Sequence, residues 1–361
     1  MTTLRSLSTE HPHASLTDRD TAALLAGLDG RGDPSGWHDA VARAGVRRRS
    51  AVAPPDRLAR LGGVDERHAL YARLAPPLAE RVARAALAGA GAEVGDVAAL
   101  LVTSSTGHLV PTLDYHLSTR LGLPPTARHL ALNDLGCVGA LRASALAADL
   151  AKGSAGVALV VAVELASLWL PSGEPCPEDL RSAMVFGDGA GAVVLDSQAA
   201  RGLRLLAYQS TLWPDSLDAR AAVQTSAGPR HVVSPRLPRA VVANLRRTLS
   251  DFLRAQAVSL PDLAFVAVNP SELELARAIV AHLDLPAAAL AAPRRAWEQH
   301  GNTLAVGPLH LLRCVAEDVA PADGALGLLL AVGPGLTCDL ALLRWGPLPV
   351  SHREDDQGAA L

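Results

Sequence analysis

The stretch LGCVGALRASALAADL, residues 135–150, places one cysteine among small residues directly before an alanine- and leucine-rich run that predicts a helix. Such a turn brings the sulfur of Cys137 close to the unpaired backbone N–H groups of a helix start, which favour a thiolate. Because a thiolate attacks acyl thioesters, one interpretation is a covalent acyl carrier. The other is a buried structural cysteine, since free cysteines are among the most buried residue types. The local residues leave both interpretations open.

Composition restricts the classes of protein to which the chain can belong. Its 361 residues are 49% hydrophobic, enough for one large core or two fused ones, and its formal net charge is −3. That balance argues against nucleic acid or an anionic membrane as the main partner. The four cysteines have no metal-ligand spacing and form no dense disulfide framework, so we expect a reducing cytosol rather than secretion, and no cysteine metal site. Because the first twenty residues lack an apolar leader and no apolar run has membrane length, we expect a cytoplasmic protein.

Short apolar runs of strand length alternate with helical patterns in both halves of the chain. Strands are predicted at residues 97–102, 157–163, 190–195, 263–268, 325–332 and 340–345. Helices are predicted at residues 78–90, 113–121, 141–150, 238–255, 273–283 and 306–319. Residues 346–361 are polar and predict a frayed tail. The alternation predicts an α/β architecture with sheets covered on both faces, and a functional site where the two halves meet.

Six segments in chain order resemble those of the type III polyketide synthases, the chalcone synthase-like branch of the thiolase superfamily. They are Ser104-Ser105-Thr106-Gly107, Gly136-Cys137, Val163-Glu164-Leu165-Ala166-Ser167, Phe186-Gly187-Asp188-Gly189-Ala190, Gly301-Asn302 and Gly333-Pro334-Gly335-Leu336-Thr337. The resemblance covers nearly the whole chain and implies a thiolase-like five-layered αβαβα fold with an internal duplication. Residues 1–200 then form the half that carries the nucleophilic cysteine, and residues 201–361 form the half that carries the asparagines.

The resemblance also implies an activity. Such enzymes load an acyl group from coenzyme A onto the cysteine, decarboxylate malonyl-CoA and join the two by Claisen condensation, as homodimers without a bound cofactor. Cys137 matches the nucleophile, and Asn302 matches the amide that holds the thioester carbonyl oxygen as charge develops. Phe186 falls on a position that shapes the substrate pocket, and Ser105 belongs to a matching segment that we place beside that pocket.

The pattern breaks at the third catalytic group, which in the family is a histidine in a His-Pro-Gly-Gly motif. The corresponding segment is Asn269-Pro270-Ser271-Glu272, and its interval to Asn302 (302 − 269 = 33 residues) agrees with the family's. An amide cannot accept the thiol proton or pair with a thiolate, although it can donate hydrogen bonds to a carbonyl oxygen. A Cys-Asn-Asn set therefore predicts impaired chemistry, with roughly one to two orders of magnitude less reactive thiolate.

Several other polar residues have two interpretations. His231 falls in a stretch that resembles the family segment with a second pocket-shaping residue. One interpretation is that His231 serves as a displaced base for the cysteine. The other, which we favour, is an exposed loop histidine. His108 and His300 are expected at the surface, with His300 facing away from Asn302. Glu164 follows a buried strand, and its carboxylate is interpreted either as a paired structural group or as part of the pocket wall.

The run Arg47, Arg48 and Arg49 lies where the family approaches the phosphates of coenzyme A. Arginine forks suit phosphate oxygens, but a triple arginine in a solvated loop is equally consistent with the sequence.

The main hypothesis is an acyl-CoA-dependent acyltransferase or condensing enzyme of secondary metabolism, with Cys137 as the acyl carrier. Within that class, loss of the histidine favours either slowed decarboxylative extension or acyl transfer to an oxygen or nitrogen nucleophile. The alternative is a catalytically degenerate homologue that acts as the non-catalytic partner of an active synthase, and it rests on the same Asn269.

Overall fold

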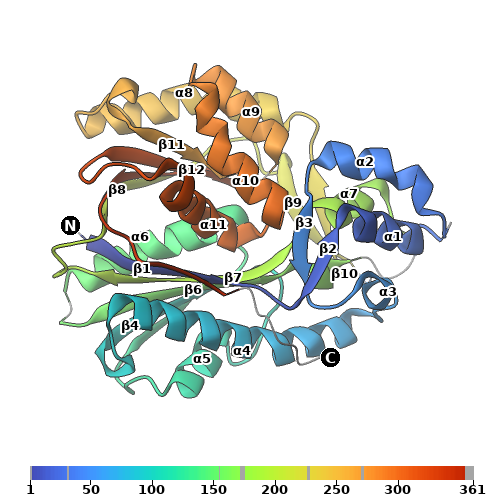
Figure 1. Ribbon diagram of the computed structural model, residues 1–361, viewed down its shortest axis with the longest axis horizontal. Helices are drawn as coiled ribbons and strands as arrows, with labels where there is room; N and C mark the ends of the chain where they lie inside the picture. Colours follow the sequence, from blue (N-terminus) through green and yellow to red (C-terminus); the bar gives the residue numbers. More distant parts are fainter. Residues whose placement is uncertain are drawn as a thin grey trace.

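The computed structural model describes residues 2–30, 32–153, 155–170, 175–225, 228–269 and 272–353. Its helices and strands stack in five layers (Figure 1). The outer helical layers contain α4 (Val64–Ala90) with α5 (Leu113–Leu121), and α8 (Leu237–Ala255) with α9 (Leu273–His282). Between two layers of strands lie α6 (Gly139–Ala151) and α11 (Gly307–Cys314). This αβαβα order confirms the five-layered arrangement expected from the sequence.

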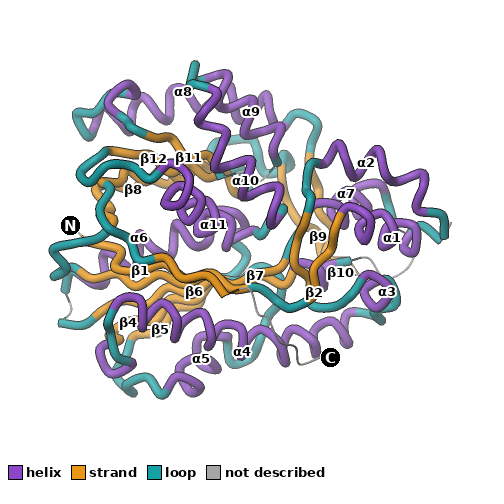
Figure 2. Tube along the Cα trace, viewed as in Figure 1, coloured by secondary structure: helices purple, strands orange, loops and turns teal. Residues whose placement is uncertain are grey.

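The strands of both layers are orange in Figure 2. Hydrogen bonds join them into one sheet, in the order β11-β12-β13-β8-β1-β7-β6-β4-β5, with β14 beside β1. Their bounds are β1 Thr2–Glu10, β4 Val97–Thr103, β5 Arg128–Ala131, β6 Val157–Leu165, β7 Asp188–Asp196, β8 Leu203–Leu212, β11 Phe265–Val268, β12 Leu326–Gly333, β13 Thr337–Arg344 and β14 Val350–Arg353. The β1–β8 ladder joins the two layers. The loop between β7 and β8 contains the boundary that we drew at residue 200 between the halves.

The pairing pattern repeats between the two halves of the sheet. In the first half β4 pairs with β6 in parallel, β6 with β7 antiparallel, and β7 with β1 antiparallel. The second half has the same sequence of pairings for β11, β12, β13 and β8. Each central helix is also preceded by a 3₁₀ turn, Gly136–Val138 before α6 and Leu304–Val306 before α11. This repetition is the predicted internal duplication, and it brings the two turns together at the middle of the molecule.

A smaller region lies at one end of the layers, at the right of Figure 1. Its helices are α1 (Asp18–Leu28), α2 (His38–Ala44), α3 (Pro55–Leu58) and α7 (Pro177–Val185), and α10 (Ala291–His300) lies beside it. Two antiparallel ladders of two strands belong to the region: β2 (Ala14–Thr17) with β3 (Arg48–Ala51), and β9 (Arg220–Thr225) with β10 (Gly228–Val233). No helix of the described residues is long and apolar enough to cross a membrane.

Three of the boundaries predicted from the sequence are wrong. Helix α4 begins at Val64 rather than residue 78, because it continues through Pro76 and Pro77 while burying Leu70 and Tyr71. The predicted helix 306–319 ends at Cys314 and continues as a wider π-helical turn. The supposed frayed tail contains β14, which pairs in parallel with β1; residues 354–361 lie outside the described residues.

Candidate active site

Cys137 lies in the 3₁₀ turn before α6, as the sequence predicts, with its side chain only 1% exposed. Gly136 has a φ of 54°, a left-handed conformation that glycine adopts without steric cost. The N–H of Gly136 donates a hydrogen bond of 3.0 Å to Oγ of Ser105. Ser105 therefore supports the cysteine turn, and it also lines a small cavity of roughly 120 Å³ together with Tyr71 and Trp169.

Glu164 ties the two central turns together. Its carboxyl oxygens accept hydrogen bonds from the N–H of Ser105 at 3.0 and 3.1 Å, and from the N–H of Ala305 at 3.4 Å. Burial raises the pKa of Glu164 to about 8, despite these donors, so the carboxyl is largely protonated at neutral pH. Of the two interpretations from the sequence, the geometry supports the structural one.

This raised pKa predicts how stability changes with pH. The folded state favours the protonated Glu164 carboxyl. The contribution of this group to the free energy of unfolding is therefore complete below its unfolded-state pKa of ~4.3, and it is lost as the pH rises through about 8. We expect the melting temperature to fall between pH 6 and pH 9, and Glu164→Gln to flatten that decline. The exposed control Glu274→Gln should keep the wild-type slope in the same melting curves. Equal slopes in all three proteins would contradict the assignment.

Asn302 contacts the sulfur directly. The Cys137 thiol donates to Oδ1 of Asn302 over 3.6 Å, and the N–H of Leu304 donates to the same oxygen at 3.0 Å. This second donor fixes which end of the amide faces the sulfur. Gly301, with a φ of 64°, lets the chain pass so close to Val185 that a Cβ would lie 2.3 Å from its carbonyl oxygen. In the resting state Asn302 thus accepts the thiol hydrogen bond.

Asn269 is buried beside Cys137, where it contacts the backbone rather than the sulfur. Its Nδ2 donates to the Cys137 carbonyl oxygen at 3.2 Å, and its Oδ1 lies where a Cβ on Gly307 would approach to 2.8 Å. Because this donor is bound to a peptide carbonyl, Asn269 positions the cysteine turn rather than facing a thioester oxygen. The following Pro270 and Ser271 lie outside the described residues.

Arg220, which the sequence analysis missed, is the second group on the sulfur. It begins β9, is 8% exposed, and its Nη2 donates to Sγ of Cys137 over 3.7 Å. Its own carbonyl accepts from the N–H of Gly335 at 3.3 Å, which anchors the strand beside the turn 333–335. No motif marks this arginine, because only the packing of the β9–β10 ladder against the second half brings it to the cysteine.

The electrostatics of Cys137 differ from the expectation of a helix-stabilised thiolate. Burial raises the pKa of the Cys137 thiol, and Glu164 adds to that rise. The Arg220 guanidinium and the hydrogen bond to Asn302 act in the opposite direction without overcoming the burial. The resting residue is therefore a thiol, whose charged form has one nearby cation to stabilise it.

A cavity of roughly 650 Å³ lies next to these groups. Its walls include Arg220 and Asn302, the two groups on the sulfur, together with Phe186 and His231. The rings of His231 and Phe186 have centroids 4.6 Å apart, and Trp169 lies equally close to His231. Phe186 and His231 therefore lie in one aromatic wall, as the resemblance implies.

His231 is half-buried on β10, so the favoured interpretation of an exposed loop histidine is wrong. Burial lowers the pKa of His231 to about 4, and the positive charge of Arg220 lowers it further in the same direction. An imidazole with so low a pKa is neutral at pH 7 and is a weak base for a thiol.

The three consecutive arginines point to three different environments. Arg47 lines the cavity, with its side chain 76% exposed and its Nε 3.5 Å from a carboxylate oxygen of Glu298. Arg48 is exposed on β3 and is absent from the cavity wall. Arg49 is buried and donates to the carbonyl oxygens of Ala183 and Met184. Of the three, only Arg47 lies where a ligand in the cavity could meet it, so the phosphate role predicted for Arg49 is wrong.

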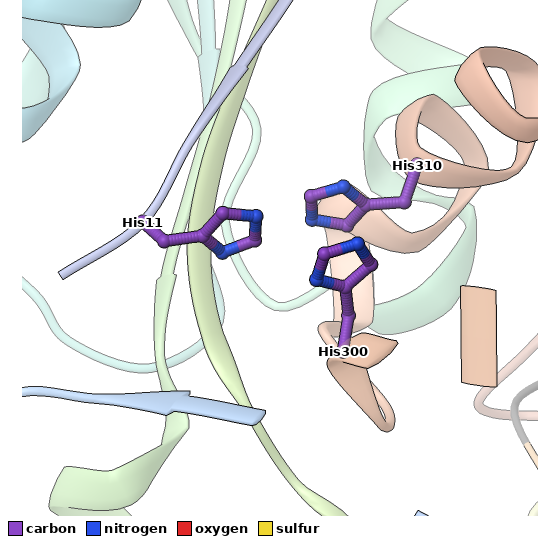
Figure 3. Close-up of side chains that lie close together, drawn as sticks. All are labelled: His11, His300 and His310. Carbon is purple, nitrogen blue, oxygen red and sulfur yellow. The ribbon is translucent and has the colours of Figure 1, made fainter. Parts of the chain in front are cut away.

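Three histidines from distant parts of the chain meet in the interior: His11, His300 and His310 (Figure 3). Their potential ligand atoms lie within 4.8 Å of one another, the one such group among the described residues. However, Arg313 donates to Nε2 of His300 at 2.8 Å, so a guanidinium lies where it would repel a metal ion. The stacked rings, with centroids 4.2–4.8 Å apart, are better explained as packing.

The outcome for the two histidines expected at the surface is mixed. His300 is buried, so the surface interpretation is wrong for it, whereas His108 is exposed and lies 3.0 Å from a carboxylate oxygen of Asp134.

Comparisons with known proteins find one matching family model and several similar proteins. Residues 57–199 match the family model of the N-terminal domain of chalcone and stilbene synthases. The chain is 32% identical over 308 residues to 1,3,6,8-tetrahydroxynaphthalene synthase of Streptomyces peucetius subsp. caesius, covering 84% of this chain and 81% of that protein. It is 32% identical over 295 residues to bisdemethoxycurcumin synthase of Oryza sativa subsp. japonica, covering 78% of this chain and 73% of that protein.

A solved structure is also similar over nearly the full length of both chains. It is the 1,3,6,8-tetrahydroxynaphthalene synthase of Streptomyces coelicolor A3(2), described as a bacterial type III polyketide synthase. The TM-score is 0.89 at 25% identity, and the match covers 96% of this chain and 99% of that chain.

Proposed function

Because the chain belongs to the type III polyketide synthases, a family of condensing enzymes, we propose that it forms an acyl-enzyme on Cys137 from an acyl-CoA and then transfers or condenses the acyl group. The observation that carries the proposal is the environment of the sulfur. Sγ lies between Oδ1 of Asn302 and the Arg220 guanidinium, and both of these groups face a cavity large enough for a substrate chain.

The loading step requires a thiolate. When the Cys137 thiol loses its proton, Arg220 stabilises the anion, which a neutral amide at Asn269 cannot do. The thiolate attacks the thioester carbonyl, the new S–C bond forms, and the bond to coenzyme A breaks. The released coenzyme A thiolate takes up the proton that the Cys137 thiol lost. The Arg220 N–H groups are the donors available for the charge that develops on oxygen, because the end of the Asn302 amide that faces the sulfur is the acceptor Oδ1.

The substrate is expected to enter through the mouth of the cavity. Arg47 lies on the cavity wall with its guanidinium largely exposed, where it can meet a phosphate of coenzyme A. Acyl-CoA and malonyl-CoA as substrates, and a homodimeric enzyme, form part of this proposal.

The decisive experiment is intact-protein mass spectrometry after incubation with a panel of acyl-CoA thioesters. The proposal requires an added acyl mass on the protein, which peptide mapping then assigns to Cys137. Carbon dioxide released from malonyl-CoA then distinguishes decarboxylative condensation from transfer to an oxygen or nitrogen nucleophile. A protein that remains unmodified by the whole panel would overturn the proposal.

Introducing the missing imidazole tests whether the site has been rebuilt. We expect Asn269→His to leave the acylation rate within about tenfold of wild type, because the cationic partner of the sulfur is already Arg220 and a second cation would be repelled. The variant also loses the hydrogen bond from Asn269 to the Cys137 carbonyl, which stabilises by about 1 kcal/mol in typical cases. A hundredfold gain in single-turnover acylation would contradict the rebuilt site.

The alternative function, a non-catalytic partner of an active synthase, is favoured by one observation. The Cys137 thiol has its pKa raised by burial, which is the opposite of what an efficient nucleophile needs. Co-purification with a related synthase, together with a changed product from that synthase, would support this alternative. Acylation of Cys137 at a rate that matches product formation would exclude it.

A further inference from the structure

The guanidinium of Arg220 donates a hydrogen bond to one side chain in the resting site, the neutral thiol of Cys137. Its Nη2 donates to Sγ of Cys137, whereas Nη1 is buried without a hydrogen-bond partner among the described residues. No carboxylate of those residues lies within ion-pair distance of Arg220. The nearby Asp179 instead pairs with Arg230 at 3.3 Å, and Glu164 is bound to backbone N–H groups. The guanidinium is thus a buried cation that has no anionic partner among the described residues while the sulfur is a thiol, and only the thiolate of the loading step balances its charge.

Acylation removes that balance. When the thiolate becomes a neutral thioester, Arg220 stays buried beside it and loses its anion. A buried charge without a partner is costly, and a guanidinium with an open edge is well shaped for two carboxylate oxygens. A neutral acyl chain leaves this cation unpaired, whereas a chain that carries its own anion restores the pair.

We propose that the acyl group carried by Cys137 has a second, free carboxylate that binds Arg220, so that the site selects short dicarboxylic acyl-CoA thioesters such as malonyl- or succinyl-CoA. This inference rests on the proposed acyl-enzyme. The chain is short because the guanidinium lies only 3.7 Å from the sulfur. The aromatic wall of Phe186 and His231 lines the same cavity and limits the access of water to the pair.

The same contact opposes loss of the carboxylate from the bound acyl group. Decarboxylation of a malonyl thioester breaks the bond between its C2 and the carboxylate carbon. Carbon dioxide leaves, and the electron pair remains on C2 as an enolate of the thioester. A guanidinium bound to the carboxylate holds negative charge on those oxygens and stabilises the starting state. The malonyl group on Cys137 is therefore expected to stay intact.

The test compares two acyl groups of the same shape. Succinyl-CoA carries a carboxylate where 4-methylpentanoyl-CoA carries two methyl groups, so the ratio of their Cys137 acylation rates reports the preference for charge. Any effect of Arg220 on the thiolate cancels in that ratio. We expect at least a tenfold preference for succinyl in the wild type, and its loss or reversal in Arg220→Met, both measured by intact-protein mass.

A neighbouring arginine provides the matched control. Arg230 lies on β10, pairs with Asp179 and is 41% exposed, so Arg230→Met removes the same charge without touching the sulfur. This variant should keep the wild-type ratio, and melting curves establish that both variants are folded. Equal ratios in the wild type and Arg220→Met would overturn the inference while leaving the acyl-enzyme intact. The absence of an adduct from every thioester would overturn the proposed function itself, and with it this inference.

Discussion

Cys137→Ala should abolish acyl-enzyme formation, with no added mass on the protein from any acyl-CoA and a rate of product formation reduced by about 10³-fold or more. The reason is that the reaction depends on a sulfur atom that forms a covalent bond, which a methyl group cannot form. Cys137→Ser should behave similarly, because a serine hydroxyl has a much higher pKa than a thiol and the described part of the site offers no base to remove its proton. Time-resolved intact mass and product analysis measure both variants.

The other cysteines make this prediction specific. Cys314 and Cys338 are buried, whereas Cys176 is partly exposed and is therefore the most accessible competitor for reactive thioesters. Cys176→Ala should leave the adduct and the product unchanged, and peptide mapping should assign the added mass to Cys137. An adduct that survives Cys137→Ala and disappears in Cys176→Ala would refute the assigned nucleophile.

Arg220→Met should slow alkylation of Cys137 by iodoacetamide at pH 8 by about tenfold or more. A cation 3.7 Å from the sulfur favours the thiolate, so removing it raises the pKa of the Cys137 thiol further. The fraction of reactive thiolate then falls at any fixed pH below that pKa. The curve of rate against pH should keep its shape and move to higher pH. A merely structural role of the arginine would lower reactivity without moving that curve.

The control for this prediction is again Arg230→Met, whose charge is paired with Asp179 away from the sulfur. It should reproduce the wild-type pH dependence. An identical pH dependence in Arg220→Met would show that the guanidinium and the thiolate are not coupled, and the stabilisation proposed for the loading step would then be wrong.

Elements buried on both faces were the most predictable from the sequence. Strand β6 has nine consecutive buried residues, nearly all apolar, because it lies between two helical layers. Strand β1 was missed although it is almost wholly buried, since several of its buried side chains are hydroxyls. Thr2 and Ser6 satisfy those hydroxyls by donating to the carbonyl oxygens of Ala148 and Ala86, and such partners become known only in the folded chain.

In the candidate site, the sequence likewise identified some residues but not their contacts. Cys137 and Asn302 were identified by the Gly136-Cys137 and Gly301-Asn302 segments that resemble the family's, and the structure brings these two segments together. Asn269 was found by its interval to Asn302, but its contact with the Cys137 carbonyl was not. The environment of Arg49 was predicted wrongly, because two neighbours in an identical run can differ completely in burial.

By itself, the sequence determined the alternation of strands and helices, because apolar periodicity is a local property of the chain, and its resemblance to a known family singled out Cys137 and Asn302. Only the tertiary structure decided what surrounds the sulfur: a neutral imidazole in an aromatic wall, an amide bound to the backbone, and the guanidinium of Arg220. Charge and burial depend on which distant segments pack together, and the pKa of a thiol follows from those neighbours rather than from its position in the chain.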